Sequence, residues 1–237
     1  MDYEFIQYET DGNGITTITM NRPPVNAFNA KMRGELVHAL KSFGDARDER
    51  IAILTGAGKL FSAGEDLRNV PLNGNDMRDD MAMAGYAEET LSQYHNMIRL
   101  ILLTGKPIIA VLNGVAAGAG MSIALACDYR IAKDQHSFVT AFESMGLVPD
   151  SGMMLTLPRL KDESTLFMFP ITPDALVESL TRTSNLTYSF SKEIRTRALL
   201  RELNEHVFPW EIRAQTYCLQ SEFFKQKASE FLARRSK

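Results

Sequence analysis

Short hydrophobic runs alternate with stretches of helical periodicity along the first part of the chain. The β-rich runs 5–10 and 15–20 flank a turn sequence, Asp-Gly-Asn-Gly, and together they predict a β-hairpin. After Asn29, a residue type that favours helix N-caps, apolar residues recur at helical spacing as far as Gly44. The continuous hydrophobic run 51–54 then predicts a buried strand. Strand, helix and strand in this order are typical of an α/β fold.

The same pattern repeats and then gives way to helices. We expect a long helix around 79–104, and from Leu160 onward the β signal fades. We therefore divide the chain into an α/β core, 1–160, and a helical region, 161–237. The other predicted elements are a strand at 108–112, a Gly/Ala-rich segment at 118–126, a strand at 129–132, and helices at 191–203 and 210–235.

The composition argues against several classes of partner. The 237 residues carry 26 Lys and Arg against 29 Asp and Glu, a net charge of −3 without a basic block, so neither nucleic acid nor an anionic membrane is expected as a partner. Two cysteines cannot build a disulfide framework or a four-ligand zinc site, and we expect no metal. The acidic start at 1–4 lacks the basic flank of a signal peptide, and the ending at 235–237 differs from a peroxisomal signal. We expect a cytoplasmic protein without a membrane span.

Three segments, 61–67, 113–122 and 138–152, follow or interrupt predicted strands, where α/β folds place chemistry. Small residues in the first allow the backbone to approach a ligand, although a flexible loop would have the same composition. The glycine-rich second segment enters an apolar helix, whose free N–H groups suit an oxyanion, although close helix packing is an alternative. Asp150 in the third segment could be a catalytic group, a turn-former or a helix N-cap.

In this order, the segments resemble the crotonase family, the enoyl-CoA hydratase/isomerase superfamily. The resemblance runs from about residue 5 to 160, and its motifs lie at 21–29, 62–67, 113–124 and 146–152. It implies an α/β crotonase-type spiral of repeated β-β-α units, followed by C-terminal helices that act as lid and trimerisation region. A homotrimer or homohexamer would follow. The stretch 161–190 lacks the usual helix pair and looks abridged.

The family binds acyl-CoA thioesters and stabilises the enolate formed from them with two backbone N–H groups. Carried over to this chain, the oxyanion-hole donors would be Glu65 and Ala119. CoA is part of the substrate, so the resemblance implies no separate cofactor. It assigns substrate and CoA binding to Arg22, Ser62, Ala63, Gly64, Asp66, Leu67, Gly118 and Phe142.

The chain differs from hydratases of this family at two positions. Where those enzymes carry two glutamates, this chain has Ser122 and Phe142, neither of which can replace a carboxylate in handling water. The neighbouring Glu143 would point to the other face in extended structure, and we interpret it as structural. The run 146–152 is similar to Δ3,Δ2-enoyl-CoA isomerases and to ring isomerases of phenylacetate degradation. A 1,3 proton shift needs one base, and we predict that Asp150 is that base.

Three other functions remain open. The chain could be hydratase-like, or it could bind acyl-CoA without turnover, a reading that the abridged stretch 161–190 favours. It could also be a serine hydrolase with Ser122 as nucleophile, because the Clp-type serine proteases resemble this fold. That reading needs a histidine with an acid, and no histidine sits in a recognisable motif. The histidines are His38, His95, His136 and His206.

Overall fold

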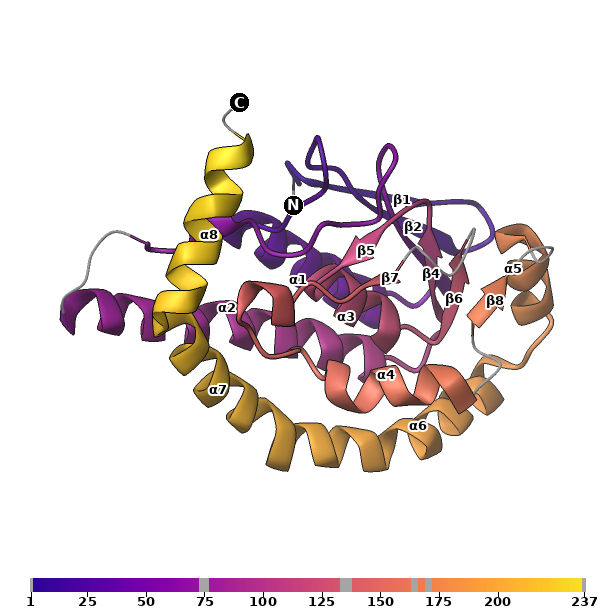
Figure 1. The fold of residues 1–237 in the computed structure, drawn as a ribbon. Helices are drawn as coiled ribbons and strands as arrows, with labels where there is room; N and C mark the ends of the chain where they lie inside the picture. The colour runs from indigo at the N-terminus through magenta and orange to yellow at the C-terminus, as the bar shows by residue number, and fades with distance from the viewer. Residues whose placement is uncertain (1, 73–76, 133–137, 163–165, 169–171, 236–237) are drawn as a thin grey trace.

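The structure is a computed structural model that describes residues 2–72, 77–132, 138–162, 166–168 and 172–235. Within these residues the centre is a six-stranded sheet with the strand order β1-β2-β3-β4-β6-β8 (Figure 1). β1 and β2 form the predicted antiparallel hairpin, and the later strands are parallel to their neighbours. The strands are β1 Ile6–Thr10, β2 Ile15–Met20, β3 Ile51–Gly56, β4 Ile108–Leu112, β6 Tyr129–Ala132 and β8 Leu166–Met168.

A second, smaller pair of strands lies beside the ends of the main sheet. β5, Ala116–Ala117, is parallel to β7, Phe138–Val139. Because parallel strands end at the same edge of a sheet, the loops after β3 and β4 emerge together, and β5 begins in the second of these loops. This edge is where the three segments singled out from the sequence meet.

Three helices cover one face of the sheet: α1 Ala30–Asp45, α2 Met77–Leu103 and α3 Ala119–Ala126 (Figure 1). The Asn29 side chain accepts a hydrogen bond from Met32 N at 2.8 Å, which confirms the predicted N-cap of α1. Apolar residues that alternate along the strands pack against these helices and form the main core. They include Ile18 and Met20 of β2, Leu54 of β3, and Ile108, Ala110 and Leu112 of β4.

The opposite face of the sheet is covered by α5, Pro173–Thr181. Leu176 and Leu180 of this helix pack with Ile51, Ile109 and Ile131 from the other side of the strands. The expectation that only helices follow residue 160 is wrong, because β8 adds a short strand to the edge of the sheet beside β6. Its pattern is too short to stand out, since three residues span barely more than one period of strand alternation. Parts of the stretch expected to be abridged, 163–165 and 169–171, lie outside the described residues.

The C-terminal helices form an arc around the helical side of the molecule (Figure 1). α6 Asn185–Glu202 continues through a π-helical turn at Leu203–Val207 into α7 Phe208–Gln220, and α8 Glu222–Arg235 then turns away. α4, Met153–Asp162, lies between this arc and α3. The single helix expected at 210–235 is therefore two helices. They separate at Ser221, whose extended backbone ends α7 and whose Oγ accepts from Phe224 N at 3.2 Å.

A buried carboxylate ties α6 to the sheet. Asp128, just before β6, binds Lys192 Nζ at 2.6 Å and Arg195 Nη2 at 2.5 Å, both from α6. The same carboxylate accepts from the backbone N–H of Ile108 at 2.9 Å. Asp128 and Lys192 are both nearly inaccessible to solvent, so the charges are satisfied by each other and by backbone groups.

The division of the chain at residue 160 stays a prediction.

Candidate active site

The first two predicted loops lie directly against each other. Isolated β-bridges pair Ser62 with Ala116 and Phe28 with Glu65. Gly64 has a φ of +85°, and a Cβ added there would lie 2.8 Å from the carbonyl oxygen of Ala117 and 3.2 Å from the amide nitrogen of Ala119. Only glycine permits this approach, so the small residues of both loops serve close contact between two backbones.

This arrangement leaves the backbone N–H groups of Glu65 and Ala119 without a hydrogen-bond partner among the described residues. On either side of Glu65, Phe28 N donates to Gly64 O at 2.8 Å and Asp66 N donates to Phe28 O at 2.9 Å. Ala119 is the first residue of α3, so its N–H has no partner within that helix. In the part of the chain that the structure describes, neither amide donates to a backbone carbonyl of a turn or loop. Both are available for a ligand oxygen.

The Glu65 side chain has a structural role, because three neighbouring side chains bind it. Its carboxylate accepts from Tyr86 Oη at 2.8 Å and Tyr94 Oη at 2.6 Å, both on α2, and pairs with the guanidinium of Arg33 on α1. Burial raises the pKa of Glu65, although Arg33 and the two tyrosines oppose the shift. With these three donors in place, the side chain fixes the loop that presents the Glu65 amide.

Asp150 precedes α4 and lies against α3 at Ser122, one helical turn after Ala119. Ser122 Oγ donates to the Asp150 carbonyl oxygen at 3.0 Å and thereby attaches the Asp150 loop to α3. The carboxylate is buried and accepts from Ser151 Oγ at 2.8 Å and from Gln215 Nε2 at 2.8 Å. Burial, followed by the nearby charge of Glu211, raises the pKa of Asp150 to about 7. A carboxylate with this pKa is suited to proton transfer near neutral pH.

The helix-cap interpretation of Asp150 finds no support in these contacts. The residue faces the start of α4 with its carbonyl oxygen, which accepts from Met153 N at 3.1 Å. Within the described residues, the hydrogen-bond partners of its carboxylate are side chains and include no α4 backbone amide. Its immediate neighbour, Ser151, has a φ of +57°, a conformation that a residue with a side chain rarely adopts.

The two residues that the family resemblance compares with the hydratase glutamates, Phe142 and Ser122, are buried. Phe142 precedes the short 3₁₀ turn at Glu143–Met145, and Glu143 itself is exposed. Ser122 is fully buried, and its hydroxyl group contacts the carbonyl oxygens of Asp150 and Gly118. No hydrogen bond in the described part of the chain joins Ser122 to a histidine, so nothing there activates it as a nucleophile.

The remaining predicted binding residues separate into supporting and accessible groups. Ser62 is fully buried, donates to Asn26 O at 2.7 Å and accepts from Gly64 N at 3.1 Å, so it supports the loop. Arg22 pairs with Asp66 at 2.9 Å and donates to Ala27 O at 2.8 Å. Ala63 and Leu67 are half-buried, and Gly118 donates to Val139 O at 3.3 Å.

The sequence analysis missed a second arginine at this position. Arg68 binds the Asp66 carboxylate through Nε at 2.8 Å and Nη2 at 2.6 Å, and its side chain is 67% exposed. Although burial opposes ionisation, hydrogen bonds from Arg68 and Arg22 lower the pKa of Asp66 to about 2. The spacing of an acid and a base two residues apart at a loop end was the signal that could have indicated it.

The sequence analysis also missed three side chains that lie behind the Asp150 loop. Glu211 and Gln215 come from α7, and His95 comes from α2; all three are buried. They lie more than 50 positions from Asp150 in the sequence, so no local motif joins them. The available signal was the periodicity of α7, because Phe208, Glu211, Gln215 and Leu219 share its buried face. Polar residues among apolar ones on such a face require buried partners.

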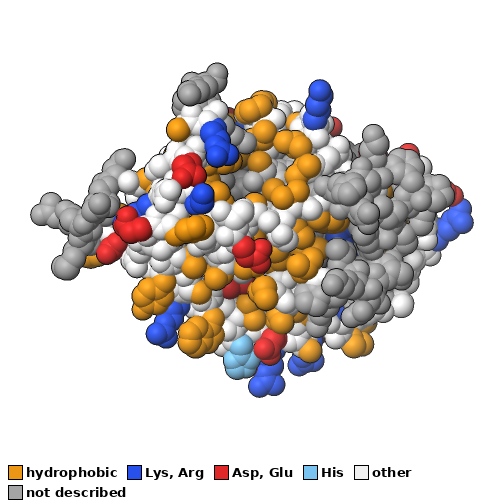
Figure 2. Space-filling model, viewed as in Figure 1, with side chains coloured by type: hydrophobic (Ala, Val, Ile, Leu, Met, Phe, Trp, Pro, Cys, Tyr) orange, Lys and Arg blue, Asp and Glu red, His pale blue; other side chains and the backbone are white. Residues whose placement is uncertain are grey.

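The face of the molecule on which β5 lies carries a group of apolar side chains. Figure 2 shows hydrophobic side chains gathered over the middle of the face on which β5 lies, with basic and acidic side chains toward its edges and around α8. Among the described residues, no cluster of histidine, cysteine or carboxylate side chains could hold a metal ion. No helix of the described chain is both long and apolar enough to cross a membrane.

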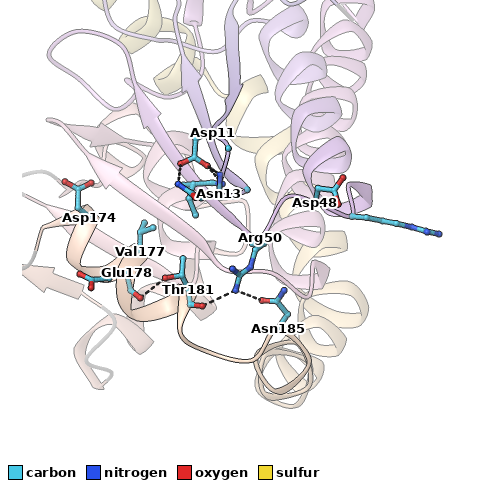
Figure 3. Close-up of a pocket in the computed structure, with 13 residues that line it drawn as sticks. Asp11, Asn13, Asp48, Arg50, Asp174, Val177, Glu178, Thr181 and Asn185 are labelled. Atoms are coloured by element: carbon cyan, nitrogen blue, oxygen red, sulfur yellow. Dashed lines mark hydrogen bonds between the residues drawn. The ribbon is translucent and has the colours of Figure 1, made fainter.

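A separate pocket of about 750 Å³ opens between the hairpin turn and α5 (Figure 3). It lies at the start of β2, away from the sheet edge that carries Asp150. Arg50 reaches across it to Thr181 O at 3.1 Å, while acidic side chains of both walls, Asp11 and Asp174, line it as well. The mixed charges and the wide opening give it no convergent set of catalytic groups.

Comparison with known proteins agrees with these observations. A family model described as "Enoyl-CoA hydratase/isomerase" matches residues 10–163. The chain is 37% identical over 159 residues to 1,2-epoxyphenylacetyl-CoA isomerase of Escherichia coli K12, covering 66% of this chain and 58% of the relative. It is 40% identical over 163 residues to a probable enoyl-CoA hydratase of Rhodobacter capsulatus, covering 67% and 58%. Carnitinyl-CoA dehydratase of E. coli K12 is 38% identical over 152 residues, covering 64% and 54%. The matches thus span less than two thirds of these relatives.

Solved structures resemble nearly the whole chain. An enoyl-CoA hydratase from Mycobacterium avium subsp. paratuberculosis K-10 superposes with a TM-score of 0.79 at 22% identity, covering 98% of this chain and 97% of that one. An enoyl-CoA hydratase from Bacillus halodurans gives a TM-score of 0.80 at 20% identity, with coverage of 96% and 100%. At this identity the likeness concerns the fold, and it confirms the expected fold class, α/β with C-terminal helices.

Proposed function

Because the chain belongs to the enoyl-CoA hydratase/isomerase family, we propose that it moves the double bond of an enoyl-CoA thioester from the Δ3 to the Δ2 position, or carries out a related ring isomerisation. One observation carries this proposal. Asp150 is a buried carboxylate whose pKa is raised to about 7, and its loop is held to α3, the helix that begins at Ala119, while both hydratase glutamate positions lack a carboxylate. A single base is sufficient for a 1,3 proton shift.

In the proposed reaction, the ionised carboxylate of Asp150 removes a proton from C2 of the 3-enoyl thioester. The electron pair of the broken C–H bond enters the conjugated system, and negative charge develops on the thioester oxygen. The amides of Glu65 and Ala119 donate to that oxygen and stabilise the dienolate. Protonated Asp150 then returns the same proton at C4, which places the double bond between C2 and C3. The carboxylate is regenerated, and no further cofactor is consumed.

We propose that the CoA moiety binds along the loop 62–67, with its adenine near the backbone of 65–67. Two arginines support this placement, since Arg22 and Arg68 flank Asp66 there and the Arg68 side chain is largely exposed. Isothermal titration calorimetry with acetyl-CoA tests the placement directly. We expect binding that weakens in an Arg68→Ala variant, whereas a folded protein without measurable affinity would contradict the proposal.

Relatives named hydratase and dehydratase keep water addition as a second candidate. The deciding experiment incubates the protein with 3-enoyl-CoA and 2-enoyl-CoA of several chain lengths and scores isomerisation against hydration. We expect isomerisation to dominate. Hydration of 2-enoyl-CoA at a matching rate would favour the hydratase, and binding without any turnover would favour a non-catalytic acyl-CoA-binding protein. Inertness toward serine-directed fluorophosphonates is expected, because Ser122 is buried against carbonyl oxygens.

We also propose a cytoplasmic homotrimer or homohexamer that acts on acyl-CoA and binds neither nucleic acid nor membranes. The near-neutral charge supports the second part. Exposed apolar side chains along α6, namely Leu186, Phe190 and Ile194, support the assembly of several copies.

A further inference from the structure

Gln215 of α7 forms a three-point clamp on the Asp150 loop. Its Oε1 accepts from the Val148 amide at 3.2 Å, and its Nε2 faces the Val148 carbonyl oxygen at 3.4 Å and the Asp150 Oδ2 at 2.8 Å. Because the Val148 N–H can only donate, the amide oxygen of Gln215 must face it. The Gln215 NH₂ group is consequently obliged to point at the Asp150 carboxylate. A side chain held in this way stabilises the ionised form of Asp150.

Glu211 lies one turn earlier on the same helix face and binds the same loop from behind. Its Oε1 accepts from Gly152 N at 2.9 Å, and its Oε2 is 2.8 Å from His95 Nε2. The imidazole is stacked on Phe208, with ring centroids 3.9 Å apart. Burial and the charge of Arg99 lower the pKa of His95 to about 3, so this histidine is neutral at pH 7. Within the described residues, no lysine or arginine pairs with the Glu211 carboxylate.

We propose that Glu211 and Gln215 are positioning residues for Asp150, which hold its loop together and act on its charge with opposite sign. The amide of Gln215 favours the carboxylate, whereas the uncompensated carboxyl of Glu211 opposes it. The two effects come from a single helix face, and that face belongs to the C-terminal region. The inference rests on the proposed function only for its catalytic consequence, since the ionisation of Asp150 can be measured without substrate.

Among the described residues, other polar and charged groups around Asp150 also affect its ionisation. Ser151 Oγ donates to its Oδ1, and Ser122 of α3 binds only its carbonyl oxygen. Glu65, in the loop after β3, adds a weaker unfavourable charge, and Arg33 pairs with that residue. Among the described residues, Glu211 is thus the acid with the largest effect on Asp150, and no lysine or arginine pairs with it. Burial raises the pKa of Glu211 to about 7 as well, so the two carboxyls titrate in the same range and influence each other.

Two isosteric changes on α7 separate this proposal from simple packing. Glu211→Gln removes the opposing charge and keeps the acceptor for Gly152 N, so the titration midpoint of Asp150 should fall, by about one pH unit. Gln215→Met removes the donor and keeps the volume, so the midpoint should rise by a similar amount. A role limited to packing would move both midpoints in the same direction or not at all. Gln220→Met, at a half-buried position at the end of α7 whose amide donates to Asp80 O of α2 and not to the Asp150 loop, is the matched control and should leave the midpoint unchanged.

The experiment is a carboxyl ¹³C NMR titration of the full-length protein, with the Asp150 resonance assigned by its loss in Asp150→Asn. The same variants are then assayed for the pH dependence of kcat/KM with 3-enoyl-CoA. Opposite shifts in the NMR midpoints support the inference, and matching shifts of the acidic limb of kcat/KM connect it to catalysis. Midpoints that do not move, or that move together, would overturn it. If Gln215→Met does not fold, the sign of the Glu211→Gln shift decides alone.

The two proposals fail in different ways. Opposite NMR shifts in a protein that turns over no enoyl-CoA would remove the proposed reaction and leave the inference about α7 intact. Isomerase activity in variants whose Asp150 midpoint is unmoved would leave the proposed reaction intact and overturn the inference about α7.

Discussion

Asp150 has a donor on each carboxylate oxygen and almost no contact with solvent, and these two facts predict opposite effects on its charge. Burial is the larger effect, so its pKa lies above the ordinary value. The raised pKa means that the ionised Asp150 carboxylate lowers the stability of the folded protein. A carboxyl with a raised pKa in the folded protein costs no stability below its unfolded-state pKa, and the cost grows as pH rises to about 7. The protein therefore keeps a destabilising group at this position, as catalytic sites often do.

We expect Asp150→Asn to lose ~10² or more in turnover, because the amide cannot accept the proton. The asparagine can still bind Gln215 through Oδ1 and Ser151 through Nδ2, so the loop should keep its conformation. Chemical denaturation should show stability at pH 8 equal to or above that of the wild type, with a smaller difference at pH 5.5. Nearly full isomerase activity would assign Asp150 a purely structural role.

Ala119→Pro tests the proposed oxyanion hole at a single N–H group. Proline is well accepted at the first position of a helix, and it removes the N–H that would bind the thioester oxygen. We expect kcat/KM to fall by ~10²–10³ with the thermal unfolding midpoint little changed. Ala119→Gly, which keeps the N–H, is the matched control and should retain most of the activity. Equal losses in both variants would argue against an amide role.

At the scale of elements, the placement of α7 depends on how the preceding arc is anchored. α6 is fixed to the sheet by Asp128, which binds two cationic side chains of that helix and the Ile108 amide. α6 runs through a π-helical turn directly into α7, so this anchor and the clamp on the Asp150 loop belong to one continuous arc. The arc brings residues from the last quarter of the chain to a site built by the first two thirds.

Asp128→Asn should therefore destabilise the whole protein. The variant leaves Lys192 buried without a counter-charge, and we expect the free energy of unfolding to fall by ~3–5 kcal/mol in urea denaturation. The exposed pair of Glu178 and Arg182 provides the comparison, because Glu178→Gln should change the same quantity by less than about 0.5 kcal/mol. Similar effects of the two substitutions would mean that the buried network does not anchor α6.

At the scale of the whole molecule, one face of α6 is apolar and uncovered. Leu186, Phe190 and Ile194 follow one another at intervals of four residues and are 67%, 57% and 78% exposed, and Ala198 continues the row. Of the C-terminal apolar residues, Phe208 and Phe224 are covered within this chain, whereas Trp210, Tyr217 and Phe223 stay exposed. Contiguous apolar surface of this kind is typical of an interface. It supports the proposed assembly of several copies.

We expect the wild-type protein to sediment as a trimer or hexamer at micromolar concentration and Ile194→Glu to shift it toward smaller species. Burial of a charge in an apolar interface is costly, whereas the same charge on a free helix face is not. Met81→Glu, at an exposed apolar residue on α2, serves as control and should leave the sedimentation coefficient unchanged. A monomeric wild type would contradict the assembly.

The sequence by itself determined the elements of the core and the three segments that meet at its edge. The hairpin, the N-cap at Asn29 and the strands at 108–112 and 129–132 depend on period, turn chemistry and capping, which are properties of neighbouring residues. Only the tertiary structure decided the surroundings of Asp150. Glu211, Gln215 and His95 reach it through packing between elements distant in sequence, and its pKa depends on a burial that no local pattern encodes. The end of α7 at Ser221 and the strand β8 were also missed, because one extended residue in a helical pattern and a three-residue strand are stabilised by contacts outside their own segments.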